Sequence, residues 1–408
     1  MQKINFIIPN NITDLDDLPI FNSGNYSLDV FDNEVLSFLD ELSRCILKDK
    51  DINNLPEIVA LGFWLRKSNL QRLRKENKYQ IESEHFKLSP RGKVLHICPS
   101  NVDTMFVYSL VVSLLVGNKN ILRLSSNTEE PHINKLFIHI KKLIDDKFQN
   151  LNSYINIIKY PRDKDINEQL SIKVNARLIW GGDRTIETFK NFATQPRTKD
   201  IVFPDRLSLM ILKSERILEL EGKEQKEFIN LFFNDSYTFN QLGCSSPQVV
   251  MFLGKKNHTE KALDLIVQHL NEKIELNDFD IPSIASLKFN KMVDDSIASI
   301  ISEKKGNNIV TFLEIEGSVK LHTLKSCGGG YFYKKNIHDL NEVESLNHSK
   351  IQTITHFGLS DEEISQLTKL AFGEGIDRIV PLGKALEFDY LWDGYNLFEE
   401  LSRKIAIK

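Results

Sequence analysis

The sequence predicts an α/β protein with two doubly wound lobes. Short apolar runs alternate with amphipathic helical stretches from residue 92 to residue 203, and the alternation resumes after residue 239. Strands that alternate with helices form a parallel sheet covered on both faces, as in nucleotide-binding folds. The 408 residues, 41% hydrophobic and 26% charged, have the size and composition of a globular protein of two or three domains.

The first lobe contains five predicted strands. The apolar runs place them at 93–98, 120–124, 154–159, 176–180 and 200–203, and the stretches between them predict helices at 103–116, 131–147, 166–174 and 185–192. The helix at 103–116 is apolar on most faces, so we expect it to be buried. Before this lobe, helical spacing of apolar residues predicts helices over 31–47 and 57–73.

The second lobe shows the same alternation. We expect strands at 248–253, 308–314, 330–333, 351–357 and 377–381, and helices at 259–274 and 361–372. The join between the lobes falls between residues 203 and 239.

The charges are nearly balanced, because 52 Lys and Arg residues stand against 56 Asp and Glu residues. This balance gives no electrostatic reason to expect nucleic acid or an anionic membrane as a partner. The apolar run 105–117 is too short to cross a bilayer, and the start of the sequence shows no secretory signal. We therefore expect a cytoplasmic protein with no membrane span and no nucleic-acid partner.

The four cysteines are scattered, with neither the spacing of a zinc site nor a dense disulfide pattern. Cys244 lies in a segment of small and polar residues just before a predicted strand. A thiol there could attack a carbonyl whose oxyanion is held by the Cys244 N–H and the Asn240 side-chain amide. The alternative is a buried loop cysteine that acts as a small hydrophobe. Cys98 lies in an apolar strand and is expected in the core, whereas Cys327 precedes three glycines that favour a tight turn.

A glycine pair, Gly181 and Gly182, separates a predicted strand from a predicted helix. Such a pair can bring backbone N–H groups close to a phosphate at the helix N-terminus, but a plain strand–helix turn is equally compatible with the pattern. Arg123, at the end of another strand, could pair with a ribose phosphate or lie exposed at the sheet edge.

Taken in order, these segments resemble the aldehyde dehydrogenase superfamily from about residue 92 to the C-terminus. The matching segments are His96-Ile97-Cys98-Pro99-Ser100-Asn101, Val116 to Arg123, Trp180-Gly181-Gly182, Asn240-Gln241-Leu242-Gly243-Cys244 and Gly329 to Phe332. The resemblance implies that Cys244 is the nucleophile, with Asn101 and Asn240 at the oxyanion. It also implies that Pro99, Ser100, Arg123, Ser125, Gly181 and Gly182 contact the cofactor.

A closer resemblance is to the acyl-CoA reductase family, which includes the long-chain fatty-acid reductase of bacterial bioluminescence. Its marks here are the segment from Lys199 to Ser208, then Gly243 to Pro247, and finally Arg378 to Leu386 with Leu391-Trp392-Asp393-Gly394. Several spaced segments in the same order are more specific than any one of them.

Two segments of hydrolytic aldehyde dehydrogenases are missing. There is no Glu-Leu-Gly-Gly segment, which supplies the base that activates water, and no Glu-x-Phe-Gly-Pro segment; the comparable stretch is Ile354 to Gly358. Loss of that base fits a thioester reductase and leaves the base for Cys244 unidentified. His356 could hold the nicotinamide ribose, although a packed histidine is favoured.

The resemblance implies an aldehyde dehydrogenase-like fold with the active site in the cleft between the lobes. Residues 1–208 would form a nucleotide-binding domain with an N-terminal helical region, 209–384 the catalytic domain, and 385–408 a segment that packs back on the lobes. The implied activity is reduction of acyl-CoA or an acylated protein to an aldehyde with NADPH, or else NADH. An acyl-protein synthetase partner and a homo-oligomer are also implied. The alternatives are oxidation of an aldehyde and a non-catalytic, acyl-carrying subunit.

Overall fold

The chain folds into two compact units, each built on a sheet of mostly parallel strands. The computed structural model describes residues 4–24, 28–99, 102, 104–126, 131–275, 281–315, 319–346, 348–373 and 375–408. The first unit comprises Met1–Pro204 together with Asp389–Lys408, and the second comprises Asp205–Phe388. The C-terminal residues from 389 onward are therefore part of the first unit.

The first unit contains a six-stranded sheet in the order β1-β5-β4-β3-β6-β7. Its strands are β1 (Asn5–Ile8), β3 (Lys93–Ile97), β4 (Lys119–Leu124), β5 (Ile155–Lys159), β6 (Ala176–Trp180) and β7 (Lys199–Phe203). All neighbours are parallel except β1, which runs antiparallel to β5. Strands β5 and β6 are buried along their whole length, which explains why they appear in the sequence as continuous apolar runs.

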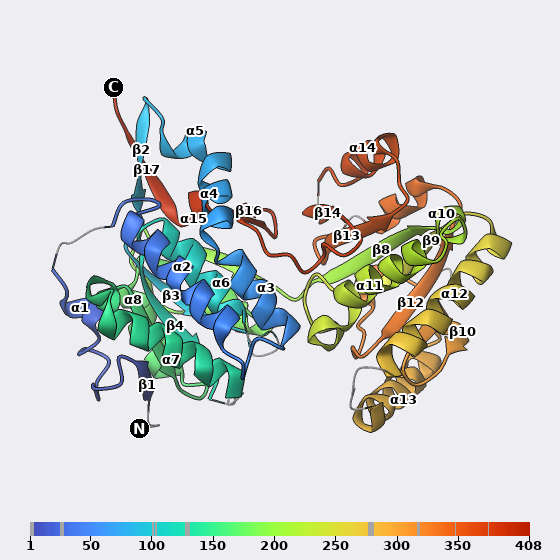
Figure 1. Cartoon of the computed structure of the whole chain (residues 1–408), viewed down its shortest axis with the longest axis horizontal. Coiled ribbons are helices and arrows are strands. Elements are labelled where there is room, and N and C mark those ends of the chain that lie inside the picture. Colours follow the sequence, from blue (N-terminus) through green and yellow to red (C-terminus); the bar gives the residue numbers. More distant parts are fainter. Residues whose placement is uncertain are drawn as a thin grey trace. The chain divides into compact units, whose positions relative to one another are not determined.

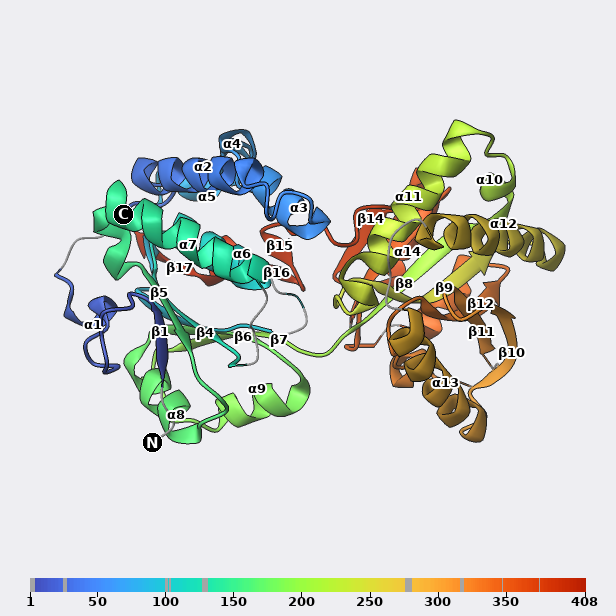
Figure 2. The same cartoon turned by 60° about the horizontal axis from the view of Figure 1, so that its bottom comes forward.

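Helices cover both faces of this sheet, as Figure 2 shows. One face carries α2 (Asn33–Lys48), α6 (Met105–Leu115) and α7 (Pro131–Asp146), and the other carries α8 (Lys164–Lys173) and α9 (Asp183–Lys190). Every residue of α6 is buried, which confirms the expectation of a buried helix. The short helix α1 (Pro19–Asn22) contributes Ile20 to the core on the side of α8 and α9.

The predicted helix over 57–73 is wrong as a single element. The structure has two helices, α3 (Pro56–Trp64) and α4 (Lys67–Glu76), because Arg66 adopts an extended conformation with ψ of 143°. No proline or glycine marks this break in the sequence. A short helix α5 (Lys78–Ile81) follows, and β2 (Phe86–Pro90) pairs antiparallel with β17 (Ser402–Ala406) from the C-terminus. The remaining C-terminal elements are β15 (Leu391–Trp392), β16 (Tyr395–Asn396) and α15 (Leu397–Glu400).

The second unit contains a seven-stranded sheet in the order β10-β11-β12-β9-β8-β13-β14. Its strands are β8 (Leu207–Lys213), β9 (Pro247–Leu253), β10 (Ile301–Gly306), β11 (Thr311–Ile315), β12 (Tyr331–Ile337), β13 (Ile351–Phe357) and β14 (Arg378–Pro381). Only the edge pair β10–β11 is antiparallel. Strand β8 lies between β9 and β13 and was not predicted.

Two apolar cores lie on opposite faces of this sheet. One packs the sheet against α11 (Lys223–Tyr237), α12 (Lys256–Glu275) and the short α10 (Ser214–Leu218). The other packs it against α14 (Asp361–Leu370) and Met292 of α13 (Ile281–Ile297). Figure 1 shows α11 and α12 crossing the same face of the sheet.

Within the described residues, no helix is both long enough and apolar enough to span a bilayer.

Candidate active site

Residues 238–246, called the nucleophile loop because they carry the predicted nucleophile Cys244, join α11 to β9 in the second unit. Its first turn, Thr238–Gln241, contains three consecutive non-glycine residues with left-handed backbone: Phe239, Asn240 and Gln241 have φ of 54°, 52° and 62°. Each such residue costs roughly 1–2 kcal/mol relative to the right-handed form. Such strain persists only where the surrounding structure holds it in place.

The side chain of Gln241 holds this loop. It is 1% exposed, and its Oε1 accepts hydrogen bonds from the backbone N–H groups of Gly330 at 2.9 Å and Tyr331 at 3.1 Å. Its Nε2 donates to the carbonyl oxygen of Pro247 at 2.8 Å. The Gln241 side chain therefore ties the start of β9 to the start of β12.

The glycine turn, Gly328–Gly330, lies against the nucleophile loop. All three residues have left-handed φ, at 81°, 62° and 80°, so they adopt a conformation that favours glycine. The N–H of Gly329 donates to the Asn240 carbonyl at 2.9 Å. A Cβ atom on Gly328 would lie 2.6 Å from the same carbonyl oxygen, which excludes any side chain there.

Cys244 is half-buried and belongs to neither apolar core of the second unit. Its carbonyl accepts a hydrogen bond from Ser208 Oγ at 2.8 Å, and the Ser246 N–H donates to the Gly243 carbonyl at 3.0 Å. The backbone on both sides of the thiol is thus fixed. A nucleophile needs this combination of a fixed backbone and a side chain outside the hydrophobic core.

The other cysteines are placed differently. Cys98 is 5% exposed and follows β3, which confirms it as a core residue, and burial raises the pKa of its thiol. Burial also raises the pKa of the Cys45 and Cys327 thiols. A raised pKa lowers the fraction of thiolate, which is the reactive form. The raised pKa therefore disfavours each of these three cysteines as a nucleophile at neutral pH.

In the first unit, the predicted cofactor residues share one edge of the sheet. Pro99 follows β3, Ser125 follows β4, and Gly181 and Gly182 follow β6, so all lie at the carboxyl ends of parallel strands. The chain proceeds from β3 towards β4 on one side and from β6 towards β7 on the other. Ligands of open α/β sheets bind at such a switch point. The predicted Ser100 and Asn101 lie outside the described residues.

The turn at Gly182 is open. Gly182 precedes α9 as its N-cap residue, and a Cβ atom added there would have no neighbour within 4 Å. Arg123 lies partly buried at the same sheet edge, where its Nη2 donates to the Tyr160 carbonyl at 3.0 Å. Its Nε is buried and has no hydrogen-bond partner in the described part of the chain.

Comparison with known proteins agrees with these features. Residues 31–404 match the family described as acyl-CoA reductase (LuxC). The chain belongs to the LuxC acyl-CoA reductase family.

Two curated relatives of this LuxC family member carry the name "Long-chain acyl-protein thioester reductase". The protein from Aliivibrio fischeri is 21% identical over 73% of this chain and 60% of its own length. The one from Vibrio harveyi is 26% identical over 72% of this chain and 59% of its own length. The match therefore spans about three-fifths of each relative.

Solved aldehyde dehydrogenase structures share the fold, which confirms the predicted fold class. Staphylococcus aureus AldH in a substrate-bound state is 15% identical, with a TM-score of 0.66 over 96% of this chain and 92% of that one. Aldehyde dehydrogenase 21 from Physcomitrella patens is 11% identical, with a TM-score of 0.67 over 93% and 86%. Methanocaldococcus jannaschii GapN, complexed with NADP, is 14% identical, with a TM-score of 0.61 over 92% and 88%.

His356 lies far from Cys244 within the second unit of this LuxC family member. It lies one residue before the end of β13, in register with Ile211 of β8, which in turn pairs with Met251 of β9. Cys244 precedes the amino end of β9, so the two residues are at opposite ends of parallel strands. Burial lowers the pKa of His356, and its Nδ1 has no partner among the described residues. This position favours the interpretation as a packed neutral histidine.

Two buried polar residues of the site were not singled out from the sequence. Gln241 stands within the nucleophile segment, but the sequence does not show that its side chain reaches β12. Lys288 on α13 is 4% exposed and donates to the Gly330 carbonyl at 3.2 Å. Burial lowers the pKa of Lys288 to about 7, and the nearby Cys327 thiol and Lys304 shift it in opposite directions. No local pattern in α13 distinguishes this lysine from a surface lysine.

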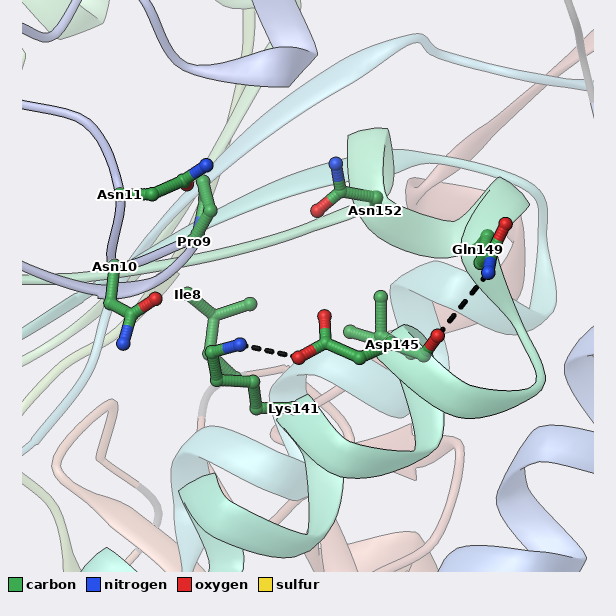
Figure 3. A pocket seen from close by; sticks show the side chains of 9 residues that line it. Ile8, Pro9, Asn10, Asn11, Lys141, Asp145, Gln149 and Asn152 are labelled. Carbon is green, nitrogen blue, oxygen red and sulfur yellow. Dashed lines mark hydrogen bonds and ion pairs between the residues drawn. The ribbon is translucent and has the colours of Figure 1, made fainter.

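A polar cavity of about 420 Å³ lies elsewhere, between β1 and α7 of the first unit (Figure 3). Asn10, Asn11 and Asn152 line it, and Lys141 pairs with Asp145 at its floor. None of the predicted site residues lines this cavity, so it adds nothing to the candidate active site.

Proposed function

We propose that this protein reduces an acyl thioester to an aldehyde with NADPH, through an S-acyl intermediate on Cys244. The observation that carries the proposal is the placement of Cys244, half-buried outside both cores on a loop that Gln241 pins. Membership of the LuxC family and the names of the curated relatives support the same chemistry.

The first step is transfer of the acyl group to the protein. The Cys244 thiolate attacks the thioester carbonyl, a new C–S bond forms, and the donor thiolate leaves. Exchange of one thioester for another needs little driving force. The Cys244 N–H and the Asn240 amide are the proposed donors to the oxyanion, together with Asn101. Asn240 is an exposed residue, and the bond from the Gly329 N–H is accepted by its backbone carbonyl and not by its side chain.

The carboxyl edge of the first sheet fits a nicotinamide cofactor. A reduced nicotinamide bound there would supply the hydride, and the C–S bond to Cys244 would then break to release the aldehyde and regenerate the Cys244 thiolate. The space at Gly182 and the backbone N–H groups that begin α9 suit a cofactor phosphate. Arg123 at this edge is compatible with the 2′-phosphate of NADPH, and NADPH is proposed over NADH by family resemblance. Pro99, Ser100 and Ser125 would complete this site.

The acyl donor is either acyl-CoA or an acylated partner protein. Both curated relatives are named as acyl-protein thioester reductases, which favours a partner such as an acyl-protein synthetase. We also propose that the protein acts as a homo-oligomer.

Mass spectrometry tests the proposal directly. The purified protein is incubated with a long-chain acyl-CoA, and the mass of the intact chain is measured before and after addition of NADPH. We expect an adduct of one acyl group that disappears with NADPH as aldehyde appears. Cys244→Ala should carry no adduct, whereas Cys327→Ala should behave like the natural protein.

Two outcomes would refute the proposal. Aldehyde formation by Cys244→Ala at the natural rate would exclude the covalent route. An adduct that NADPH and NADH both leave unchanged would indicate an acyl-carrying subunit. A second assay distinguishes the proposed reductase from an aldehyde dehydrogenase. The protein is given an aldehyde and NADP⁺, with and without CoA, and an aldehyde dehydrogenase would release free acid even without CoA.

A further inference from the structure

Gly330, the last residue of the glycine turn, is held from two sides. Its N–H donates to Gln241 Oε1 at 2.9 Å, and its carbonyl accepts from Lys288 Nζ at 3.2 Å. Gln241 belongs to the nucleophile loop, and Lys288 belongs to α13. One peptide segment thus connects a helix on the sheet face with the loop that carries Cys244.

The lysine is bound entirely by backbone oxygens. Lys288 Nζ lies 3.1 Å from the carbonyl oxygen of Asn308, 2.8 Å from that of Ile309 and 3.2 Å from that of Gly330. An ammonium group has three N–H donors, so three carbonyls satisfy all of them. The carboxylate of Asp295, one of the acids on the same helix, is bound instead by Lys291, Tyr331 and Tyr333.

Burial of this amine costs free energy that an apolar side chain would not. Transfer of an ionised group out of water carries a penalty of several kcal/mol, which hydrogen bonds offset only in part. A side chain that merely filled this space between α13 and β12 would be aliphatic, as Met292 is in the neighbouring core. The Lys288 amine therefore stabilises this region through its hydrogen bonds to the carbonyls of residues 308–309 and of the glycine turn.

The turn cannot take up another position without moving the nucleophile loop. A Cβ atom on Gly330 would lie 2.2 Å from the Tyr237 hydroxyl, and one on Gly328 would lie 3.0 Å from Leu242 Cδ2. Tyr237 ends α11 and Leu242 lies two residues before Cys244. The three left-handed residues between them are held by Gln241 and by the bond from Gly329 to Asn240. Release of the turn would let this strained segment relax.

We propose that Lys288 and Gln241 are positioning residues that act together through Gly330 to hold the Cys244 thiol in the geometry that acyl transfer requires. The proposal rests on the proposed function, since it concerns the same nucleophile. Neither side chain touches the acyl group; each acts through the backbone of the glycine turn.

A double-mutant cycle on the full chain tests this coupling. Lys288→Met and Gln241→Met remove the hydrogen-bonding groups with little change in volume, and the double variant removes both. The matched control is Lys213→Met, which removes a lysine that pairs with Glu363 of α14 at the carboxyl end of β8, whereas the glycine turn lies at the amino end of β12. Gln366→Met is the second control, because Gln366 lies on α14 and donates to Asn341 Oδ1, away from the nucleophile loop and the glycine turn.

Two rates are measured for each variant, both without cofactor. One is the single-turnover rate of S-acylation by a long-chain acyl-CoA, and the other is the rate of Cys244 alkylation by iodoacetamide. A displacement of about 1 Å can reduce a rate roughly 100-fold, so we expect each single variant to acylate at least about tenfold more slowly. The double variant should be no slower than the slower single variant, because both act on one peptide segment. The two control variants should acylate at the natural rate.

The alkylation rate separates the failure of this inference from failure of the proposed function. If the natural protein alkylates at Cys244 but never acylates, the proposed function fails, and the alkylation cycle still tests the coupling. The inference would be overturned if either Lys288→Met or Gln241→Met folds and is alkylated at Cys244 at the natural rate. Strictly additive losses in the double variant would also overturn it. Should Lys288→Met fail to fold, the two rates of Gln241→Met decide the question.

Discussion

The carboxylate of Asp235, near the end of α11, accepts the backbone N–H of Gly383 at 2.6 Å. Its other oxygen accepts the N–H of Ala385 at 3.0 Å. Leu386, the next residue, packs so closely on the nucleophile loop that a Cβ on Gly243 would lie 3.1 Å from its Cδ2. One buried acid thus fixes the last turn of the second unit against the residue before Cys244.

We expect Asp235→Asn to change how the stability of the second unit depends on pH. Burial raises the pKa of Asp235 to about 7, from 3.8, because the carboxylate is 1% exposed. Between those values the unfolded chain loses a proton that the folded chain keeps, so the stability of the natural protein falls as pH rises from about 4 to 7. The loss is at most about 4 kcal/mol. The Asn variant should lack this slope.

Urea unfolding at pH 4.5 and pH 8 measures the effect, with Asp294→Asn as a control for loss of a carboxylate outside the buried site. If the natural protein and Asp235→Asn show the same difference between the two pH values, the carboxylate is ionised in the folded state and its hydrogen bonds outweigh its burial.

The pH dependence of the first unit should have the opposite sign, because of His96 in β3. His96 is fully buried: its Nε2 donates to Asn120 Oδ1 at 3.0 Å, and its Nδ1 lies 2.7 Å from Ser109 Oγ. Burial lowers its pKa to about 4. The unfolded histidine binds a proton near pH 6.5, so the stability that the neutral ring contributes is present above that value. It is lost as pH falls towards 4, by about 3 kcal/mol.

His96→Gln removes the titrating group and should flatten this dependence. Trp180, which donates to Ser109 Oγ at 3.1 Å, reports on the same region by fluorescence. Acidification from pH 7 to pH 5 should therefore lower the unfolding midpoint of the natural protein by this probe and leave that of His96→Gln nearly unchanged. An equal shift in both proteins would show that His96 is not responsible.

Much of the fold follows from periodicity in the sequence, particularly in the first unit. Strands such as β5 and β6 are buried on both faces, and so they stand out as apolar runs between polar turns. Strand β8 is just as apolar, but it lies within the stretch 203–239, where the sequence pattern predicts only the join between the lobes. Helix α11 carries a charged first turn that hides its apolar face.

The candidate site also has a part that the sequence predicts and a part that it does not. The nucleophile segment, the glycine turn and the glycine pair each have a local pattern, so Cys244 and Gly182 could be found from the sequence. Gln241 and Lys288 act on Gly330, far along the chain from both. Nothing local in the sequence records such a contact, because it arises only when β9 and β12 pair.

Gly330→Ala should destabilise the second unit. The residue has φ of 80°, and an added Cβ would lie 2.2 Å from the Tyr237 hydroxyl and 2.7 Å from the Ile309 carbonyl oxygen. Backbone strain and overpacking together should cost about 2–4 kcal/mol. Thermal unfolding checks this. Gly254→Ala is the control for backbone strain without overpacking, because Gly254 also has a positive φ, of 143°, but its nearest neighbour, Ser214 Cβ, would lie at 3.4 Å. Equal melting temperatures for the two variants would contradict the prediction.

Gly182→Ala should separate cofactor binding from folding in the first unit. The residue has φ of −62°, and an added methyl group would meet no protein atom within 4 Å, so the melting temperature should stay unchanged. The methyl would instead occupy the space proposed for a cofactor phosphate and weaken NADPH binding, by at least about tenfold for a lost charge-assisted hydrogen bond. Isothermal titration calorimetry with NADPH measures the change in binding affinity. Gly24→Ala is the matched control, since its Cβ would also meet nothing. Natural affinity for NADPH in Gly182→Ala would place the cofactor away from the turn between β6 and α9.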